Sequence, residues 1–439
     1  MTEREAGLMA SVPRAAGHGE GPAWLVSLRR DAAAHLREGG FPGKKHEKWR
    51  FTSVREVVDT PFETASPALT RGADEALVRW VDERLGEAAS RVVLADGRMV
   101  SARGVTDGVQ VESLKDALTR APSELEPVLG TLAPREHFAA LNAALFEDGV
   151  LLRIAGAIER PIEVVHVACA GAAPTAAYPR VVVIAEPKSR ATLIETYLSE
   201  GSDLKHLTSA VSEIAIGEEA RLEHARVVLG DERAFHLAYL AVRQERGSFY
   251  GSRVVTLGGA LSRLDLDVHL IGEGAEATLE GVYHVDRSEH VDHQLRVEHA
   301  APHTTSTTRY RGLLDGKGHA VLNAMGIVRP SAPGTALTQE NRNLLLSDDA
   351  TIDTKPHLEI ETDEVKASHG ATIGAVDDAA LFYLRSRGIP EAEARDLLTF
   401  AFVRELLEHI PDEATARRAS EAVLSRLPSG ARLREEVAT

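Results

Sequence analysis

A short motif recurs along the middle of the chain and limits the folds that are open to it. Each copy begins with a polar turn, often containing glycine, and continues with residues that alternate between apolar and polar. Several copies start roughly 30 residues apart, with one wider gap, and five of them read EPKSRATLIETY, GEEARLEHARVV, GEGAEATLEGVY, GKGHAVLNAMG and SDDATIDTKPHLEI. A single copy cannot bury its apolar face, so successive copies must stack. We therefore expect residues 149–374 to form the strands of a β-solenoid.

The segment before the repeats has mixed character. Apolar positions recur every four residues from Trp24 and end at a glycine pair, which predicts an amphipathic helix. In the following stretch, KKHEKWRFT, we expect an extended segment that Trp49 and Phe51 anchor to the body of the protein. Short strands and further helices follow, so residues 21–148 are predicted to form an α/β region. Residues 1–20 lack periodicity and are expected to be disordered.

The segment after the repeats is helical, and we expect residues 375–439 to form a helical domain. A short helix is predicted over Asp377–Arg387, and Pro390 precedes a second helix over Glu391–Ile410. Apolar residues cover more than one face of this second helix. That pattern suits either a well-buried helix or a surface that meets another protein.

Charge and hydropathy narrow the possible partners and locations. At 439 residues, the chain exceeds the roughly 250 to 300 residues at which a single compact core stops growing. Its formal net charge of -16 opposes binding to nucleic acid or anionic lipid, because both require Lys and Arg to neutralise phosphate. No apolar run approaches a membrane span, and the start of the chain has no hydrophobic leader. We therefore expect a cytoplasmic protein whose partners are proteins.

A cluster of histidines between His284 and His303 suggests a metal site, but strand geometry weakens the idea. Within a strand, His293 and His299 share a face yet lie about 20 Å apart, at about 3.3 Å per residue. One metal ion could be bound only with histidines from neighbouring strands, which the sequence does not reveal. The histidines of this tract are His284, His290, His293, His299 and His303.

No motif for a self-contained activity is present. The sequence lacks a nucleophile elbow, a Walker A loop, a GxGxxG fingerprint and an HExxH helix, so it has no ATP site of its own and is not expected to be an enzyme. The single cysteine, Cys169, lies in the apolar run VVHVACA and is expected to be a buried, inert thiol. His369 lies where the strand region meets the helical end, and it is either a ligand or base or a hydrogen-bonded turn residue.

Three segments resemble the shared core of the SufB and SufD scaffold proteins of iron-sulfur cluster assembly. They are RYRGLLDGKGHAVLN, NRNLLLSDDATIDTKPHLEIETDEVKASHGATIG and LFYLRSRGI. Upstream, KHEKWRFTSV is similar to the N-terminal motif of the D-type members, and the B-type cysteines are absent. The resemblance runs from about Lys45 to Ile410 and points to a D-type subunit.

The resemblance implies a right-handed parallel β-helix between an N-terminal α/β region and a C-terminal helical domain. It also implies a non-catalytic scaffold that pairs with a SufB-like subunit and carries SufC-like ABC ATPases on its helical domain. A transient iron-sulfur cluster would form at the interface with the SufB-like subunit, and the family's SHG histidine corresponds to His369. Family members often carry a cysteine two residues earlier, where this chain has Ala367. For the ATPase contact we expect Phe400, Phe402 and Leu406.

The cysteine count agrees with a shared site. An iron-sulfur cluster usually needs about four ligands, mainly Cys thiolates, and this chain has one cysteine. We therefore expect His369 to supply one imidazole as a metal ligand and the partner to supply thiolate. Two alternatives stay open, a β-helix carbohydrate-active enzyme and a self-associating structural β-helix that forms a homodimer. The sequence does not decide whether a flavin binds.

Overall fold

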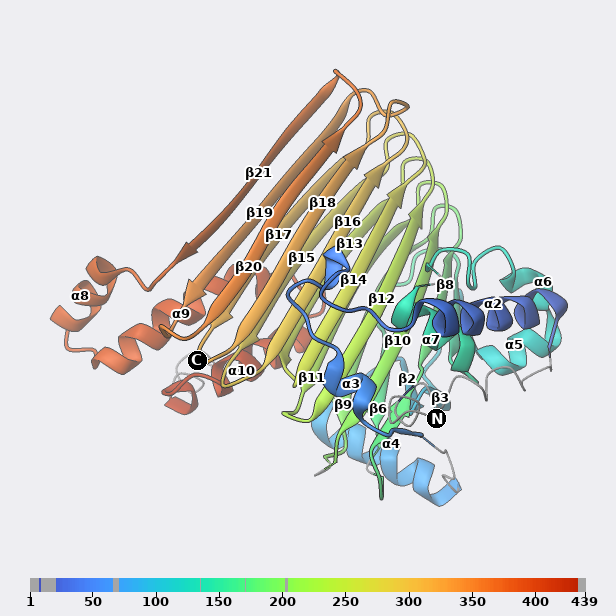
Figure 1. The fold of residues 1–439 in the computed structure, drawn as a ribbon, viewed down its shortest axis with the longest axis horizontal. Helices are drawn as coiled ribbons and strands as arrows, with labels where there is room; N and C mark the ends of the chain where they lie inside the picture. Colours follow the sequence, from blue (N-terminus) through green and yellow to red (C-terminus); the bar gives the residue numbers. More distant parts are fainter. Residues whose placement is uncertain are drawn as a thin grey trace.

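The protein is an elongated β-solenoid with helices on two sides, as the computed structural model in Figure 1 shows. The structure describes residue 8 and residues 21–65, 71–134, 136–169, 171–201 and 204–432. Of residues 1–20, only Leu8 is described, and it is buried in the N-terminal core. The expected disorder of the other residues lies outside the described part of the chain. Among the described helices, none is long and apolar enough to cross a membrane.

Two long sheets form the solenoid, and successive strands of the chain alternate between them. Sheet A consists of β1 (Glu63–Thr64), β4 (Val109–Ser113), β5 (Val150–Ile154), β7 (Thr175–Ala177), β8 (Arg180–Ala185), β10 (His206–Ile216), β12 (Ala234–Gln244), β14 (Leu261–Leu270), β16 (His290–His299), β18 (His319–Val328) and β20 (Thr351–Ile360). Sheet B consists of β2 (Arg91–Ala95), β3 (Arg98–Arg103), β6 (Ile162–Ala168), β9 (Arg190–Ser199), β11 (Arg221–Gly230), β13 (Phe249–Gly258), β15 (Glu276–Val285), β17 (Thr305–Leu314), β19 (Thr335–Leu345) and β21 (Val365–Gly374). From β5 to β21, strands that neighbour each other within a sheet are parallel.

The register of the strands explains the sequence repeat. Arg190, Arg221 and Phe249 begin consecutive strands of sheet B and lie side by side. One full rung of the solenoid uses a strand from each sheet and therefore takes about 30 residues. The first three copies of the motif open strands of sheet B and the last two open strands of sheet A, which accounts for part of the irregular spacing. One rung start, at β13, has no recognisable copy and leaves the wider gap.

The turns before the strands of sheet B from β9 to β19 repeat a single backbone feature. One residue there adopts a positive φ, the left-handed conformation that glycine accepts without strain. In successive rungs these residues are Lys188, Glu219, Gly247, Gly274, His303 and Gly334. Each of their N–H groups donates to a carbonyl in the turn of the next rung, so the corner is also hydrogen-bonded from rung to rung.

Both faces of most strands are buried. Inward side chains such as Leu193, Tyr250 and Leu266 fill the lumen between the two sheets. Outward side chains of sheet A, including Leu237, pack against the N-terminal helices, whereas those of sheet B, including Val255, pack against the C-terminal helices. Because parallel strands covered on both sides need apolar residues on both faces, several strands read as nearly continuous apolar runs.

Apart from α4, the N-terminal helices lie against sheet A, and the C-terminal helices lie against sheet B (Figure 1). The N-terminal set also includes α4, which packs on the outer face of sheet B. The bounds of this set are α2 (Ala23–Gly39), η3 (Glu47–Trp49), α3 (Arg55–Asp59), α4 (Arg71–Leu85), α5 (Leu114–Arg120), α6 (Pro122–Leu125) and α7 (His137–Leu145). The C-terminal set is α8 (Asp378–Ser386), α9 (Glu391–Glu408) and α10 (Glu413–Ser425).

The segment around Trp49 differs from the prediction. Its residues Glu47–Trp49 form a 3-10 turn, so the segment is not extended. Trp49 is 6% exposed and is the anchor, since the Arg263 guanidinium lies 3.7 Å from the centre of its ring. Phe51 is 46% exposed and anchors nothing. In an extended segment, Trp49 and Phe51 would point to the same side. The 3-10 turn breaks this alternation, so only one of the two aromatic side chains is buried.

Buried histidines make the stability of this fold depend on pH. Burial lowers the pKa of His284 and of His293 to about 3, with a further contribution from Arg426 and Arg226 respectively. As the pH falls, these histidines are protonated in the unfolded chain at a higher pH than in the folded protein. Their contribution to the stability of the folded state is therefore complete above pH ~6.5 and is lost as the pH drops towards 3. At pH 5, each of these histidines should lower the free energy of unfolding by about 2 kcal/mol relative to its value at pH 7.

We expect urea unfolding at pH 5 and pH 7 to reveal this loss. His293→Gln should reduce the difference between the two pH values by about 2 kcal/mol. His357→Gln, which changes an exposed histidine on β20, should leave the difference unchanged. Equal free energies of unfolding at both pH values in the unaltered protein would contradict the prediction.

Candidate functional site

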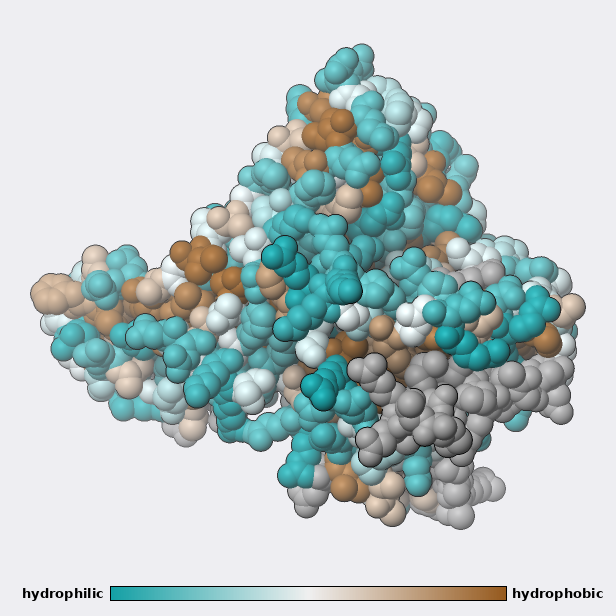
Figure 2. Space-filling model, viewed as in Figure 1, coloured by the Kyte–Doolittle hydropathy of each residue, from teal (hydrophilic) through white to brown (hydrophobic). Residues whose placement is uncertain are grey.

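The solenoid ends on an open rung. Strands β20 and β21 are the last members of sheets A and B, and each is paired on one side only. Most of their residues are exposed or half-buried, and Ile373 is 51% exposed. Figure 2 shows hydrophobic surface near the upper end of the last strands and near the end of β21. Unpaired N–H and C=O groups along such an edge are a template for another strand.

His369 lies on β21, at the mouth of the lumen. Its backbone partner on β19 is Gln339, whose side chain is buried inside the solenoid. Paired residues of neighbouring strands share a face, so His369 also faces the lumen side of the sheet. Its side chain is exposed, and Ala367 and Ala371, two residues away on the same face, are small. His369 is therefore a strand residue, and the alternative of a turn residue does not apply.

One imidazole does not make a metal site by itself. In the described part of the chain, no group of three or more His, Cys, Asp or Glu residues is arranged to hold a metal ion. His369 can supply one ligand from an exposed position. The described residues therefore offer no complete set of metal ligands at this mouth.

The histidine tract does not converge on one point. His284 lies under the C-terminal helices, where burial and Arg426 lower its pKa. His290 lies on the opposite side, with Nε2 3.0 Å from the Thr52 hydroxyl. His293 and His299 face the lumen on the same side of β16, as predicted, where they contact Thr256 and Ser306 respectively. His303 occupies a turn at φ 58°.

Cys169 is a half-buried, weakly acidic thiol. It follows β6, and its N–H donates to Asp96 Oδ1 at 3.0 Å. Burial, together with the nearby carboxylates of Asp96 and Glu200, raises the pKa of the Cys169 thiol far above its ordinary value. Because the thiolate is the species that binds metal, Cys169 is a poor ligand at neutral pH. Burial likewise raises the pKa of Asp96, to about 6.

A buried ionic cluster inside the early rungs was missed by the sequence reasoning. Glu195 lies in the lumen with no exposure and accepts hydrogen bonds from Tyr197 at 2.7 Å and Ser212 at 3.1 Å. His166, His224 and Arg226 lie within 3.3 Å of its carboxylate oxygens. Burial opposes ionisation, but Arg226 and the two histidines hold the pKa of Glu195 well below its ordinary value. The sequence does contain a sign of this cluster, because charged residues occupy inward positions of the strands LIETYL and LEHARVV.

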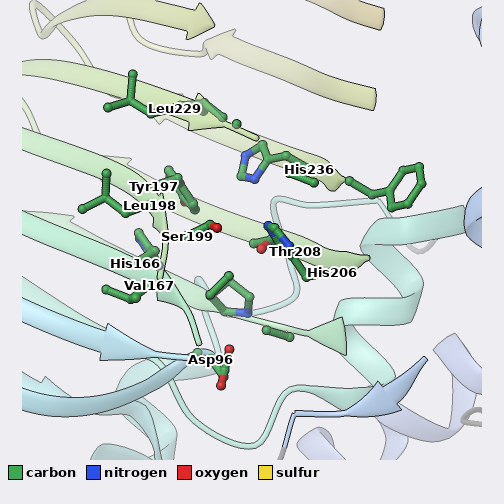
Figure 3. A pocket seen from close by; sticks show the side chains of 18 residues that line it. Asp96, His166, Val167, Tyr197, Leu198, Ser199, His206, Thr208, Leu229 and His236 are labelled. Atoms are coloured by element: carbon green, nitrogen blue, oxygen red, sulfur yellow. The ribbon is translucent and has the colours of Figure 1, made fainter. Parts of the chain in front are cut away.

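A small cavity adjoins this cluster (Figure 3). Its volume is about 30 Å³, room for about one or two water molecules. His166, Tyr197, His206 and His236 line it from neighbouring strands. Nδ1 of His166 is buried without a protein partner, which is the arrangement expected where an ordered water is bound. The cluster is therefore a buried part of the folded core.

Two of the three helical residues predicted to meet an ATPase, Phe400 and Leu406, are packing residues. Phe400 is 4% exposed, and it and Leu406 belong to the core between α9 and sheet B. Phe402 is half-buried, and its carbonyl accepts from Arg311 Nη1 at 2.6 Å. Another protein cannot reach Phe400 or Leu406 while α9 lies on the sheet. The sequence pattern could not tell which apolar face of the helix would be covered.

The exposed aromatic side chains of the C-terminal region lie on α8. Phe382 is 71% exposed and Tyr383 is 55% exposed, whereas Leu381 of the same helix is buried. In Figure 1, α8 projects beyond the end of the solenoid, close to the end of β21. Phe382 and Tyr383 are thus neighbouring, exposed aromatic side chains at this end of the molecule.

Comparison with known proteins assigns the family. Residues 167–402 match the family described as SUF system FeS cluster assembly, SufBD core domain, and residues 18–164 match the SufBD protein N-terminal region. The chain is 30% identical over 413 residues to the iron-sulfur cluster assembly protein SufD of Escherichia coli, covering 91% of this chain and 93% of that protein.

Two further relatives extend the similarity along almost the whole chain. A SufBD family protein of Synechocystis is 29% identical over 441 residues, with 97% of this chain and 96% of the relative covered. SufD of Bacillus subtilis is 25% identical over 423 residues, with 90% and 92% covered. These matches agree with the fold, and this chain belongs to the SufBD family of iron-sulfur cluster assembly proteins, as a SufD-like member.

Proposed function

We propose that the chain is a non-catalytic scaffold subunit that pairs its open rung with a SufB-like subunit, so that a nascent iron-sulfur cluster forms at their interface. The observation that carries the proposal is the position of His369, exposed on the unpaired last strand at the mouth of the lumen. A residue there can reach a partner without any change in the fold. The family assignment makes a carbohydrate-active enzyme the weaker alternative.

The ligand chemistry favours a cluster site that is shared between this chain and a partner subunit. Iron and sulfide are the cargo of this site, and a cluster usually requires about four ligands, mainly thiolates. This chain offers one imidazole at the mouth, while its single thiol is half-buried with a raised pKa and lies next to an early strand. A SufB-like partner would therefore supply the thiolates.

The open edges supply the means of pairing. Strands β20 and β21 can each accept one further strand through main-chain hydrogen bonds, and side chains on the edge then select the partner. A second copy of this chain could use the same edges, so a homodimer is the competing state when the partner is absent. We place the assembled complex in the cytoplasm, in line with the sequence analysis.

For the SufC-like ATPase we propose a contact centred on α8. Phe382 and Tyr383 are available there, whereas Phe400 and Leu406 hold α9 against sheet B. Arg311 of β17 ties the two layers together, donating to the Phe402 carbonyl and to the Glu405 carboxylate. Movement imposed on α8 would therefore pass through α9 to the late strands of sheet B, beside the open rung.

His369→Ala should leave folding and complex formation intact and lower the iron and sulfide content of the co-purified complex at least about ten-fold, because one cluster ligand is lost. The measurement is iron and sulfide analysis after anaerobic co-expression with the SufB-like and SufC-like subunits. His357→Ala, which removes an exposed histidine from the other edge strand, is the matched control and should keep the normal content. A normal iron and sulfide content in the His369→Ala complex would contradict the proposed role of His369.

Replacing both Phe382 and Tyr383 by Ala should weaken binding of the SufC-like subunit about ten-fold or more, since central aromatic residues dominate such contacts. Calorimetric titration of the full chain would measure the dissociation constant. Phe51→Ala removes another exposed aromatic residue, near the N-terminal helices, and should change nothing. Unaltered affinity in the double variant would place the ATPase contact elsewhere.

A further inference from the structure

The filling of the lumen changes towards the open end. On β15, in the middle of sheet B, the inward residues include the apolar core residues Ala277, Leu279 and Val285. On β19, the strand before the open rung, three successive inward positions are the amides Gln339, Asn341 and Asn343, all buried. Buried amides are costly unless their hydrogen bonds are satisfied, so their partners reveal what they hold together.

The Asn341 side chain connects the two sheets across the lumen. Its Oδ1 accepts from the Thr354 hydroxyl of β20 at 2.9 Å and from Asn343 Nδ2 at 2.6 Å. Its Nδ2 donates to the Tyr310 carbonyl of β17 at 3.3 Å. Asn341 thus links the last strand of sheet A to two strands of sheet B.

Asn343 extends the network in both directions along the solenoid. Its Nδ2 also lies 3.4 Å from the Thr372 carbonyl of β21, on the open edge. Its Oδ1 accepts from the Tyr283 hydroxyl, two strands deeper in sheet B. Tyr283 reaches that far because Gly312 lies between them, where an added Cβ would fall 2.3 Å from the tyrosine ring.

Gln339 forms a second tie across the lumen. With its amide oriented to satisfy both groups, it donates to the Ala324 carbonyl at 3.2 Å and accepts from the Gly326 N–H at 3.1 Å, both on β18. Gln339 is also the backbone neighbour of His369. Directly beneath His369, sheets A and B are therefore joined across the lumen by amide hydrogen bonds.

Apolar contact contributes little to the open rung. The small cluster at this end consists of Val328, Ala332 and Leu337, with Leu358 and Val365 packed partly against it. Most side chains of β20 and β21 are exposed or half-buried. Side-chain hydrogen bonds from β19 therefore help to attach these two strands to the rest of the solenoid, together with the contact of 2.8 Å between His319 of β18 and Asp353 of β20.

We propose that Asn341, Asn343 and Thr354 are positioning residues that hold β20 and β21 in register and so fix His369 at the mouth of the lumen before the partner binds. The inference rests on the proposed function only for the role of His369. A preformed last rung would let the partner strands add without first ordering the edge, which lowers the entropic cost of association.

Thr354→Val tests the network with the least disturbance, because it removes one hydroxyl at nearly constant volume. Hydrogen exchange of the full chain, followed by mass spectrometry, should show the β20 amides exchanging about five-fold faster or more, with β13 unchanged. Thr354→Ser keeps the hydroxyl and should restore slow exchange. Thr351→Val, at an exposed position of the same strand, is the matched control and should exchange like the unaltered protein.

The link to His369 is tested in the assembled complex. Thr354→Val should slow iron and sulfide incorporation about five-fold, and Thr354→Ser should recover the normal rate. Unchanged exchange in Thr354→Val would overturn the network as a brace for the last rung. Faster exchange with a normal incorporation rate, in a complex that His369→Ala inactivates, would overturn its positioning role. A normal yield from His369→Ala would instead defeat the proposed function and leave the exchange result standing.

Discussion

Backbone hydrogen bonding from rung to rung is the constraint on which this structure depends. A parallel strand satisfies half of its N–H and C=O groups through the strand before it and half through the strand after it. Every rung is therefore completed by its successor, and the last rung has none. The early end is closed by the antiparallel strands β3 and β4 and by the N-terminal helices. The late end is left open and carries His369.

The polar groups inside the solenoid divide into two kinds with different consequences. Near the early rungs, Glu195 and Arg226 form an ion pair that burial makes inaccessible, and its removal would leave an unpaired charge in the core. Near the open rung, neutral amides replace charges and tie neighbouring strands to one another. Neutral amides tolerate water at the mouth and also burial beneath a partner, whereas an ion pair would change strength as the partner excluded solvent.

Much of the architecture could be predicted from local patterns, because alternation fixes strands and a repeated turn fixes their stacking. The spans of the strand region, the helix from Trp24 and the shared face of His293 and His299 follow from periodicity alone. Contacts between rungs could not be predicted in this way. The partners of Glu195 and Asn341 depend on register, and the burial of Phe400 depends on which face of α9 meets sheet B. The turn at Trp49 depends on a guanidinium more than 200 residues further along the chain.

An end that accepts another strand also raises the question of what stops growth. Identical solenoids joined head to tail would extend without limit into filaments, because a heterologous contact that does not close continues indefinitely. Pro356 lies in the middle of β20, the last strand of sheet A, and has no N–H to donate. Proline on an edge is one of the devices by which natural sheets resist such addition. The same edge can thus favour a partner whose strand tolerates the missing donor and disfavour polymerisation of the free subunit.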